Sequence, residues 1–309
     1  MTSLVDISKI TGFSKATVSR ALSGNGYVSK KAEEEIKKVA MELDYTTNAI
    51  AQELSNGTTR NIGVVLPHVK HPFFNQILEG ILEKSFDSNY KIVILPSKYD
   101  MSLELTYLEQ FRKKAFYSMI FTSLQVDEKV ILKYQKYGQI VLCHKPECSN
   151  ISASFADRDN GYIEAFKWLK AQKVKKIAFL LSRTKSPTTS VTIQNYERVF
   201  QNRVSIDQVF GSITSIKDGY DLAPHLIQFD SIFVNSDEIG ASIWHWFDEH
   251  NLPKPIIIGQ EEMQIGKFIN LPTVNNNYHQ VGESAFELAI SDNCKQVSNK
   301  SRFILNRSV

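Results

Sequence analysis

One short segment near the N-terminus gathers side chains that suit hydrogen bonding and charge pairing with a polar surface. It reads TGFSKATVSRALSG (11–24). It has the length of a helix, but only three of its positions are clearly apolar core positions, Val18, Ala21 and Leu22. A helix that only fills a core does not place short polar and basic side chains over its first two turns. We therefore expect a polar partner to meet this face; an ordinary surface helix is the alternative.

A second set of polar and aromatic side chains follows the apolar runs further along the chain. Open α/β sheets bind ligands at the carboxyl ends of their strands. A carboxylate there can accept two hydrogen bonds, and an aromatic ring can stack on the apolar face of a pyranose or a base. These loops supply His71, Phe73, Phe74, Asn75, Ser123, Arg183, Asp237 and Glu261. Phe74 fits a core position equally well, and Asp237 could simply cap a helix at 237–250.

Patterns typical of enzymes are missing from the sequence. An α/β enzyme could use carboxylates such as Asp159, Asp237 and Glu261, but the chain has no G-x-S-x-G, no P-loop and no G-x-G-x-x-G after a strand. The segment from His68 to His71 is too isolated for a metal site. We expect no catalytic residues, no metal and no cofactor.

Composition favours an ordinary globular protein. With 309 residues, 42% of them hydrophobic, the chain can bury a sizeable core in two domains. No apolar run approaches the roughly 20 residues that span a bilayer, and MTSLVDISKI has no signal-peptide pattern. The three cysteines have no zinc spacing and suit a reducing cytoplasm. They are Cys143, Cys148 and Cys294.

Charge is concentrated at one end of the chain. The whole chain carries a formal net charge of only +3, yet residues 1–31 hold five basic residues against Asp6 alone, a net charge of +4. A basic surface at one end of a near-neutral chain is typical of a DNA-binding head. The basic residues are Lys9, Lys15, Arg20, Lys30 and Lys31.

Three short helices are expected before residue 46. Leu4, Ile7 and Ile10 mark the first, which Gly12 ends, and Ser14 can cap the second. The third opens after Ser29, and its apolar residues follow at helical spacing. Two helices joined by a tight turn predict a helix-turn-helix head.

The pattern changes near residue 60 to strands that alternate with helices. Seven Ile- and Val-rich runs predict strands at 62–66, 91–95, 118–121, 140–143, 177–181, 230–234 and 255–259. Amphipathic helices are expected between them at 75–88, 101–115, 159–172, 237–250 and 278–291. Apolar strands separated by helices indicate parallel sheets covered on both faces. Seven such strands over about 250 residues are more than we expect in a single sheet, so we predict two doubly wound subdomains.

A short apolar segment joins the two regions. NAIAQELSNGTTR (48–60) can form a helix that Asn48 caps and that ends at Asn56-Gly57. Such a helix has barely two turns and is marginal in water, so it should be ordered only when it docks against something. A simple linker is the alternative.

These segments resemble the lactose-repressor family of bacterial transcription regulators, whose effector domain is similar to periplasmic sugar-binding proteins. The likeness covers essentially the whole chain. It rests on LVDISKITGFSKATVSRALSGNGYVS, LDYTTNAIAQELSNGTTRNIGVVLP, HPFFNQILEGI, RDNGYIEAFKWLKAQKVKKIAFL, FDSIFVNSDEIGASI and LPTVNNN. It implies a DNA-binding head at 1–46, a hinge at 47–60 and an effector and dimerisation domain at 61–309. Within the last, one subdomain covers about 61–152 plus 275–309, and the other covers about 153–274.

The resemblance implies roles for individual residues. The second helix enters the major groove, where we place Lys15, Ala16 and Arg20 at bases, and the fork of Arg20 suits bidentate contact with a guanine. Phosphates are expected at Ser14, Thr17, Ser19, Asn25 and Tyr27. Leu54 stands where a hinge leucine of each subunit wedges between base pairs in the minor groove. In the cleft, Asp237 matches the family's acidic residue that binds sugar hydroxyls.

The sequence also departs from the family pattern. The hinge lacks the usual proline after Tyr45, and Glu53 puts an acid beside the wedge. Thr192 stands where the family usually carries a cleft arginine, a role for which Arg183 is a substitute candidate. The usual G-[FY]-D turn reads Gly259-Gln260-Glu261 here. These changes argue against transferring any specific sugar.

We therefore predict a cytoplasmic, nucleoid-associated regulator that binds pseudo-palindromic operator DNA as a homodimer. We predict that it represses a carbohydrate-utilisation operon under control of a small effector, a sugar or phosphosugar. A catabolite-control-type regulator switched by a protein partner is the second interpretation. The chain stops soon after FILNRSV (303–309), so a dimer is favoured over a tetramer. Helices 75–88 and 278–291 are expected at the dimer surface.

Overall fold

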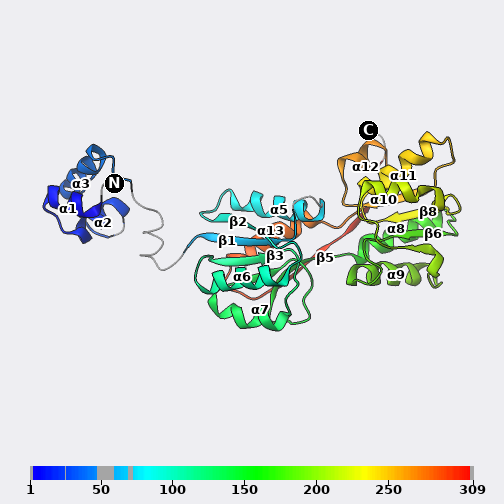
Figure 1. Ribbon diagram of the computed structural model, residues 1–309, viewed down its shortest axis with the longest axis horizontal. Coiled ribbons are helices and arrows are strands. Elements are labelled where there is room, and N and C mark those ends of the chain that lie inside the picture. The colour runs from blue at the N-terminus through cyan, green and yellow to red at the C-terminus, as the bar shows by residue number, and fades with distance from the viewer. Residues whose placement is uncertain (1–2, 25, 47–58, 69–71, 307–309) are drawn as a thin grey trace. The chain divides into compact units, whose positions relative to one another are not determined.

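The computed structural model describes residues 3–24, 26–46, 59–68 and 72–306. The chain divides into two compact units, Met1–Thr59 and Arg60–Val309, which we call the head and the effector unit. Three predicted functional positions, Asn25, Leu54 and His71, lie outside the described residues, as does most of the predicted hinge. Each unit is described by itself below (Figure 1).

The head consists of the three predicted helices. α1 (Leu4–Thr11) ends at Gly12, α2 (Lys15–Ser23) is capped by Ser14, and α3 (Lys30–Glu42) is capped by Ser29. Their shared core contains Ile7, Val18, Ala21, Ile36 and Ala40, all buried. The helices and caps are therefore confirmed. Ile10 is an exception, because it is 60% exposed at the end of α1 and not part of that core.

The first sheet of the effector unit contains six strands, and all of its pairings are parallel. In β1, Val64 packs with one core cluster and Val65 with another, as alternation along a strand requires. Helices therefore cover both faces (Figure 1). In spatial order the strands are β11 (Gln296–Lys300), β5 (Ser152–Asp157), β4 (Ile140–Leu142), β3 (Ser118–Phe121), β1 (Asn61–Leu66) and β2 (Lys91–Pro96). The helices are α5 (Pro72–Ser85), α6 (Met101–Arg112), α7 (Glu128–Tyr134) and α13 (Tyr278–Ala289), with the 3₁₀ turn η1 (Gln135–Tyr137).

The second sheet also has six strands and is parallel except for one edge. β12 runs antiparallel to β10 at that edge. The spatial order is β12 (Arg302–Ile304), β10 (Thr273–Asn275), β9 (Ile256–Gln260), β8 (Ser231–Val234), β6 (Ile177–Leu180) and β7 (Val209–Phe210). The helices are α8 (Asp159–Ala171), α9 (Pro187–Phe200), α10 (Ile216–Leu222), α11 (Asp237–Glu249) and α12 (Gln264–Phe268), with the 3₁₀ turns η2 (Ile206–Gln208) and η3 (Ala223–Leu226).

Three segments carry the chain between the two sheets in the described part of the effector unit. They join β5 to α8, β10 to α13 and β11 to β12. The predicted subdomain boundaries near 152 and 275 therefore need adjustment, because β5 belongs to the first sheet and β12 to the second. Two doubly wound lobes, the predicted architecture, are confirmed.

Helices α5 and α13 lie side by side on the first sheet and approach each other very closely. A Cβ added at Gly80 would lie 2.0 Å from the carbonyl oxygen of His279, and one added at Gly282 would lie 2.0 Å from that of Ile77. Only glycine leaves room for backbone at that distance. The two glycines therefore fix the separation of the helices.

Candidate nucleic-acid interface and effector site

The exposed face of α2 carries the side chains that the sequence predicts for DNA recognition. Lys15, Ala16, Ser19 and Arg20 are exposed, while Val18 is fully buried beneath them. The i, i+1, i+4, i+5 spacing puts the four exposed side chains on one face. α2 therefore has one face for the core and one polar, basic face available to a partner.

The turn between α1 and α2 holds this face in a fixed orientation. The Ser8 hydroxyl donates to the carbonyl of Phe13 at 2.7 Å, and the Gly12 amide donates to the carbonyl of Ser8 at 3.0 Å. Ser14 Oγ accepts the Thr17 amide at 3.2 Å and lies 2.9 Å from Thr17 Oγ1. Ser14 thus caps the helix, and its predicted phosphate contact would use the remaining hydrogen-bonding capacity of the same hydroxyl.

The stem of Arg20 packs over a glycine in the following loop. Gly26 has a φ of +106°, and a Cβ there would lie 3.3 Å from Arg20 Cδ. This backbone conformation disfavours other residues. The loop therefore supports the guanidinium that we expect at a base, and it also carries Tyr27, which is 93% exposed.

Replacing Gly26 by alanine is expected to weaken operator binding about tenfold while the head stays folded, because backbone strain of about 1–2 kcal/mol and a displaced Arg20 stem act together. Fluorescence anisotropy with a selected operator duplex measures the effect. Gly24→Ala is the matched control: Gly24 also has a positive φ, +69°, but an added Cβ meets nothing within 4 Å. An equal loss in both variants would contradict a role for the contact with Arg20.

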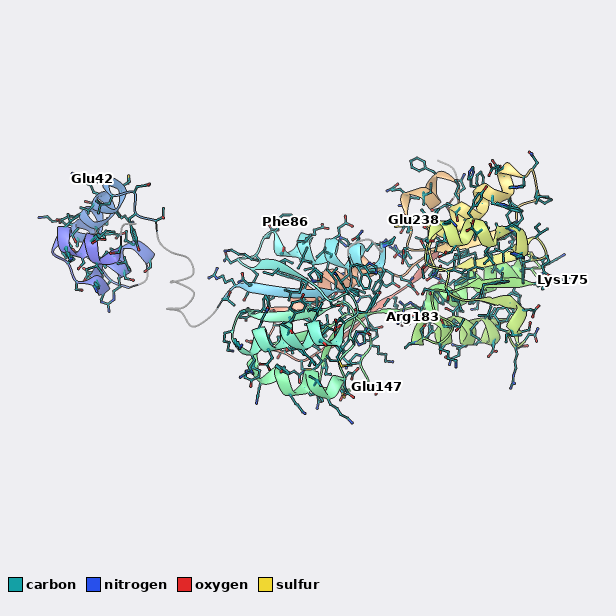
Figure 2. The ribbon with its side chains drawn as sticks, viewed as in Figure 1. Glu42, Phe86, Glu147, Lys175, Arg183 and Glu238 are labelled. Carbon is teal, nitrogen blue, oxygen red and sulfur yellow. The ribbon has the colours of Figure 1, made fainter. Side chains whose placement is uncertain are left out.

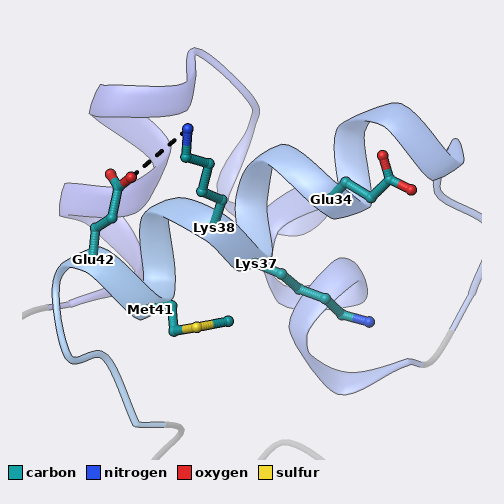
Figure 3. A pocket seen from close by; sticks show the side chains of 5 residues that line it. All are labelled: Glu34, Lys37, Lys38, Met41 and Glu42. Atoms are coloured by element: carbon teal, nitrogen blue, oxygen red, sulfur yellow. Dashed lines mark ion pairs between the residues drawn. The ribbon is translucent and has the colours of Figure 1, made fainter.

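The helix α3 presents a different surface. Glu34, Lys37, Lys38, Met41 and Glu42 line a hollow of about 490 Å³ on its outer side, where Lys38 pairs with Glu42 at 3.9 Å (Figure 3). Four of the five side chains are charged, and Met41 is 80% exposed. The hollow is open to solvent and surrounded by charged side chains, so it lacks the enclosure of a small-molecule site.

In the effector unit, aromatic side chains gather where strands of the first sheet end. The rings of His68 and Phe74 lie 5.6 Å apart and those of Phe73 and Phe74 4.7 Å apart, each pair edge to face. Tyr99, after β2, lies 5.9 Å from His68. Phe74 is 5% exposed, so it belongs mainly to the core. Ser123, after β3, has a buried hydroxyl with no hydrogen-bond partner among the described residues.

Side-chain contacts join this region to the second lobe. The guanidinium of Arg183 lies over the Tyr99 ring, 5.5 Å from its centre. The Gln76 side-chain amide donates to the carbonyl of Glu261 at 2.8 Å. Figure 2 shows Arg183 at the edge of the second lobe that is nearer to the first. Side chains from the strand ends of both sheets therefore meet, as the sheet rule predicts.

Asp237 and Glu261 are both buried carboxyl groups. Asp237 is 0% exposed, and it accepts the Thr273 hydroxyl and the Met263 amide, each at 2.7 Å. Burial nevertheless raises the pKa of Asp237 to about 7. Glu261 is 5% exposed at a φ of +89°, and its Oε2 has no hydrogen-bond partner among the described residues. Burial and the nearby Asp237 hold the pKa of Glu261 well above its usual range.

A polar network that the sequence analysis missed lies where the chain crosses between the lobes. Arg158, directly after β5, donates to the Tyr278 hydroxyl at 2.7 Å. The Gln260 side-chain carbonyl accepts the Tyr162 hydroxyl at 2.8 Å and the Asn276 amide at 3.3 Å. The Nε of Arg158 is buried and has no hydrogen-bond partner among the described residues. The only sequence signal was the position of Arg158 after a strand, and SASFAD was too polar to be predicted as one.

Two family profiles match this chain. Residues 3–48 match the bacterial regulatory proteins of the lacI family, and residues 59–290 match the periplasmic binding proteins and sugar binding domain of the LacI family. The chain belongs to the LacI family. It is therefore a DNA-binding transcriptional regulator, as the sequence predicts.

Relatives match this LacI-family chain over nearly its whole length. It is 32% identical to catabolite control protein B of Bacillus subtilis (strain 168) over 309 residues, which cover 98% of this chain and 99% of the relative. It is 25% identical to the ribose operon repressor of Lactococcus lactis subsp. lactis (strain IL1403) over 321 residues, covering 99% and 95%. Its fold matches the lac repressor dimer bound to operator and an anti-inducer with a TM-score of 0.82 at 14% identity, covering 98% and 97%.

The departures from the family pattern can be located in the fold of this LacI-family member. Thr192 is fully buried on α9, and its hydroxyl donates to the Thr188 carbonyl at 3.0 Å. Arg183, the substitute candidate for the missing arginine, is exposed in the loop after β6. Arg158 is another arginine in this region, and its charge attracts the Glu261 carboxylate. The effector roles of Phe73, Phe74, Ser123, Arg183, Asp237 and Glu261 stay predictions. No helix among the described residues is long and apolar enough to cross a membrane.

The raised pKa of Asp237 predicts how stability depends on pH. Between about pH 4 and 7 the folded chain holds a proton that the unfolded chain has released, so the unfolding free energy should fall as pH rises, by up to about 1.4 kcal/mol per pH unit, and level off above pH 7. Asp237→Asn should remove part of this slope, leaving that of Glu261. Urea unfolding followed by tryptophan fluorescence reports on the second lobe, which holds Asp237, because Trp168 on α8 and Trp244 and Trp246 on α11 all lie in it.

The exposed Asp221→Asn on α10 is the control for this pH profile and should leave the slope unchanged. If the profiles of the wild type and Asp237→Asn ran parallel from pH 5 to pH 8, the ionisation of Asp237 would not be responsible for the slope.

Proposed function

We propose that this LacI-family protein represses genes for carbohydrate use, and that a small effector bound between the lobes controls its affinity for operator DNA. The observation that carries the DNA part is the exposed face of α2, with Lys15, Ala16 and Arg20 over the buried Val18. These three side chains are proposed to contact bases. Phosphate contacts are proposed for Ser14, Thr17, Ser19, Asn25 and Tyr27, and the minor-groove wedge for Leu54.

Selection of bound sequences from random duplexes tests this proposal. One head reads only a few base pairs, so a two-fold dimer should recover a two-fold symmetric motif with a flexible pyrimidine–purine step at its centre. Recovery of no motif, with or without added metabolites, would contradict sequence-specific regulation.

The proposed dimer surface includes exposed apolar side chains of the first lobe. Phe86, directly after α5, is 82% exposed (Figure 2). Leu82 on α5 is 37% exposed. Ile94 on the edge strand β2 is 43% exposed. The apolar side chains of α13 are instead mostly buried in the lobe. The proposal therefore places the apolar part of the dimer surface on α5 and β2, with α13 supplying polar side chains.

The effector is proposed to be a sugar or phosphosugar held by the strand-end loops of both lobes. Solved structures of similar fold include one of a LacI-family regulator from Enterococcus faecium with bound ribose, 18% identical with a TM-score of 0.67. A thermal-shift panel of sugars and phosphosugars tests the proposal. A ligand at 100 times its dissociation constant should add about 2.7 kcal/mol of stability.

A protein partner in place of a sugar is the second candidate. It is favoured by the 32% identity to a relative named catabolite control protein B. If no sugar in the panel changed the melting temperature and a second protein enhanced operator binding, the protein-partner candidate would be favoured. The relatives named above are transcriptional regulators or control proteins, and we propose no enzymatic activity.

A further inference from the structure

Three metal-ligating side chains meet on the surface of the first lobe, away from the strand ends that form the proposed effector site. Glu83 comes from α5, and His279 and Glu283 come from α13. One ligand atom from each lies within 4.8 Å of the others, and His279 Nε2 lies 2.9 Å from Glu83 Oε2. Nearly 200 residues of chain separate Glu83 from the other two, so only the fold brings them together.

The helices that carry these side chains cannot easily move apart or together. Gly80 lies one turn before Glu83, and the carbonyl that approaches it belongs to His279 itself. Gly282 directly precedes Glu283 and approaches the carbonyl of Ile77 in the same way. The close approach therefore fixes the backbone on both sides of the cluster, and a site fixed in this way loses little conformational entropy when it binds an ion.

The charge of the cluster suits a cation. The neighbouring Lys84 pairs with Glu287 at 3.1 Å and also attracts Glu283 and Glu83, so it offsets part, but not all, of the negative charge of the cluster. In the single chain, 39% of the His279 side chain is accessible. Two carboxylates and an imidazole offset the charge of a divalent ion.

We propose that Glu83, His279 and Glu283 form a divalent transition-metal site that bridges α5 and α13. An imidazole with two carboxylates suits Zn²⁺, Co²⁺ or Ni²⁺, whereas Mg²⁺ and Ca²⁺ select oxygen ligands. Three protein ligands leave a coordination position for water. Binding at this site ties two helices together and stabilises the effector unit through mass action.

Titration of the full-length, untagged and chelator-treated protein tests the site. Isothermal titration with Zn²⁺ should give one ion per chain, and Co²⁺ should give a visible absorption band from an imidazole- and oxygen-ligated centre. His279→Asn and Glu283→Gln should each weaken binding about tenfold or more, since loss of even an outer-shell partner of a metal ligand costs 10–100-fold. Glu79→Gln, an exposed carboxylate one turn before Glu83 on α5, is the matched control and should bind like the wild type.

The midpoint of urea unfolding followed by circular dichroism is the second measurement. Zn²⁺ should raise it in the wild type and in Glu79→Gln but not in His279→Asn. Absence of binding at millimolar Zn²⁺ would overturn the proposal, and so would binding that survives His279→Asn unchanged, because another histidine would then hold the ion.

Discussion

Arg20→Ala is expected to abolish the preference for operator over bulk DNA. An arginine bidentate to guanine contributes about 1–3 kcal/mol of discrimination, so a dimer with two altered heads should lose about 2–6 kcal/mol. Arg20 is exposed on the same face of α2 as Lys15 and Ala16, and its stem rests over Gly26. Titrations of operator and random duplexes at several salt concentrations measure both kinds of binding.

The salt dependence separates a base contact from a phosphate contact. Nonspecific binding by Arg20→Ala should stay close to that of the wild type, with nearly the same slope against salt, since phosphate contacts dominate that slope. Lys9→Ala, an exposed lysine on α1, is the control and should weaken both kinds of binding alike. Equal loss of specific and nonspecific binding in Arg20→Ala would remove its proposed role at a base.

Gly80→Ala is expected to destabilise the effector unit by about 3 kcal/mol or more, near the upper end of what overpacking costs. The added Cβ would lie 2.0 Å from the carbonyl oxygen of His279 and 3.0 Å from the Glu283 amide. Both atoms belong to the backbone, so α5 and α13 would have to separate. The midpoint of urea unfolding followed by circular dichroism measures the loss, since it includes the helices of the first lobe.

Glu79→Ala is the matched control, because Glu79 is the exposed neighbour of Gly80 on α5 and alanine is a better helix former. It should leave the midpoint within about 0.5 kcal/mol of the wild type. A Gly80→Ala variant as stable as Glu79→Ala would mean that the two helices do not pack at the described distance.

Much of the fold could be predicted because its signals are local. Ser14 and Ser29 were predicted to open helices and Gly12 to end one, and each does so. Long apolar strands such as β1 could be predicted equally well. The missed strands are short or polar: β5 reads SASFAD and β11 reads QVSNK. Their residues form strands because neighbouring strands supply the pairing, which no local pattern reveals.

The candidate sites also contain residues that could be predicted from local sequence and residues that could not. Residues at strand ends could be predicted, since the ends of parallel strands meet at one edge of a sheet. That the Asp237 carboxyl turns inward to Thr273 and Met263 depends on loops distant in sequence. The same holds for Arg158 on a crossing segment and for the cluster of Glu83, His279 and Glu283, whose members come from opposite ends of the effector unit.

The order in which the two units can be completed during synthesis follows from the three crossings. The first sheet needs β11 and the second needs β12, so neither lobe is whole until residues 296–304 have left the ribosome. The head is continuous and ends at Thr59. At about 5–20 residues per second, the rest of the chain takes on the order of ten seconds or longer to translate. A nascent chain can therefore complete its DNA-binding head well before the effector unit that controls it is complete.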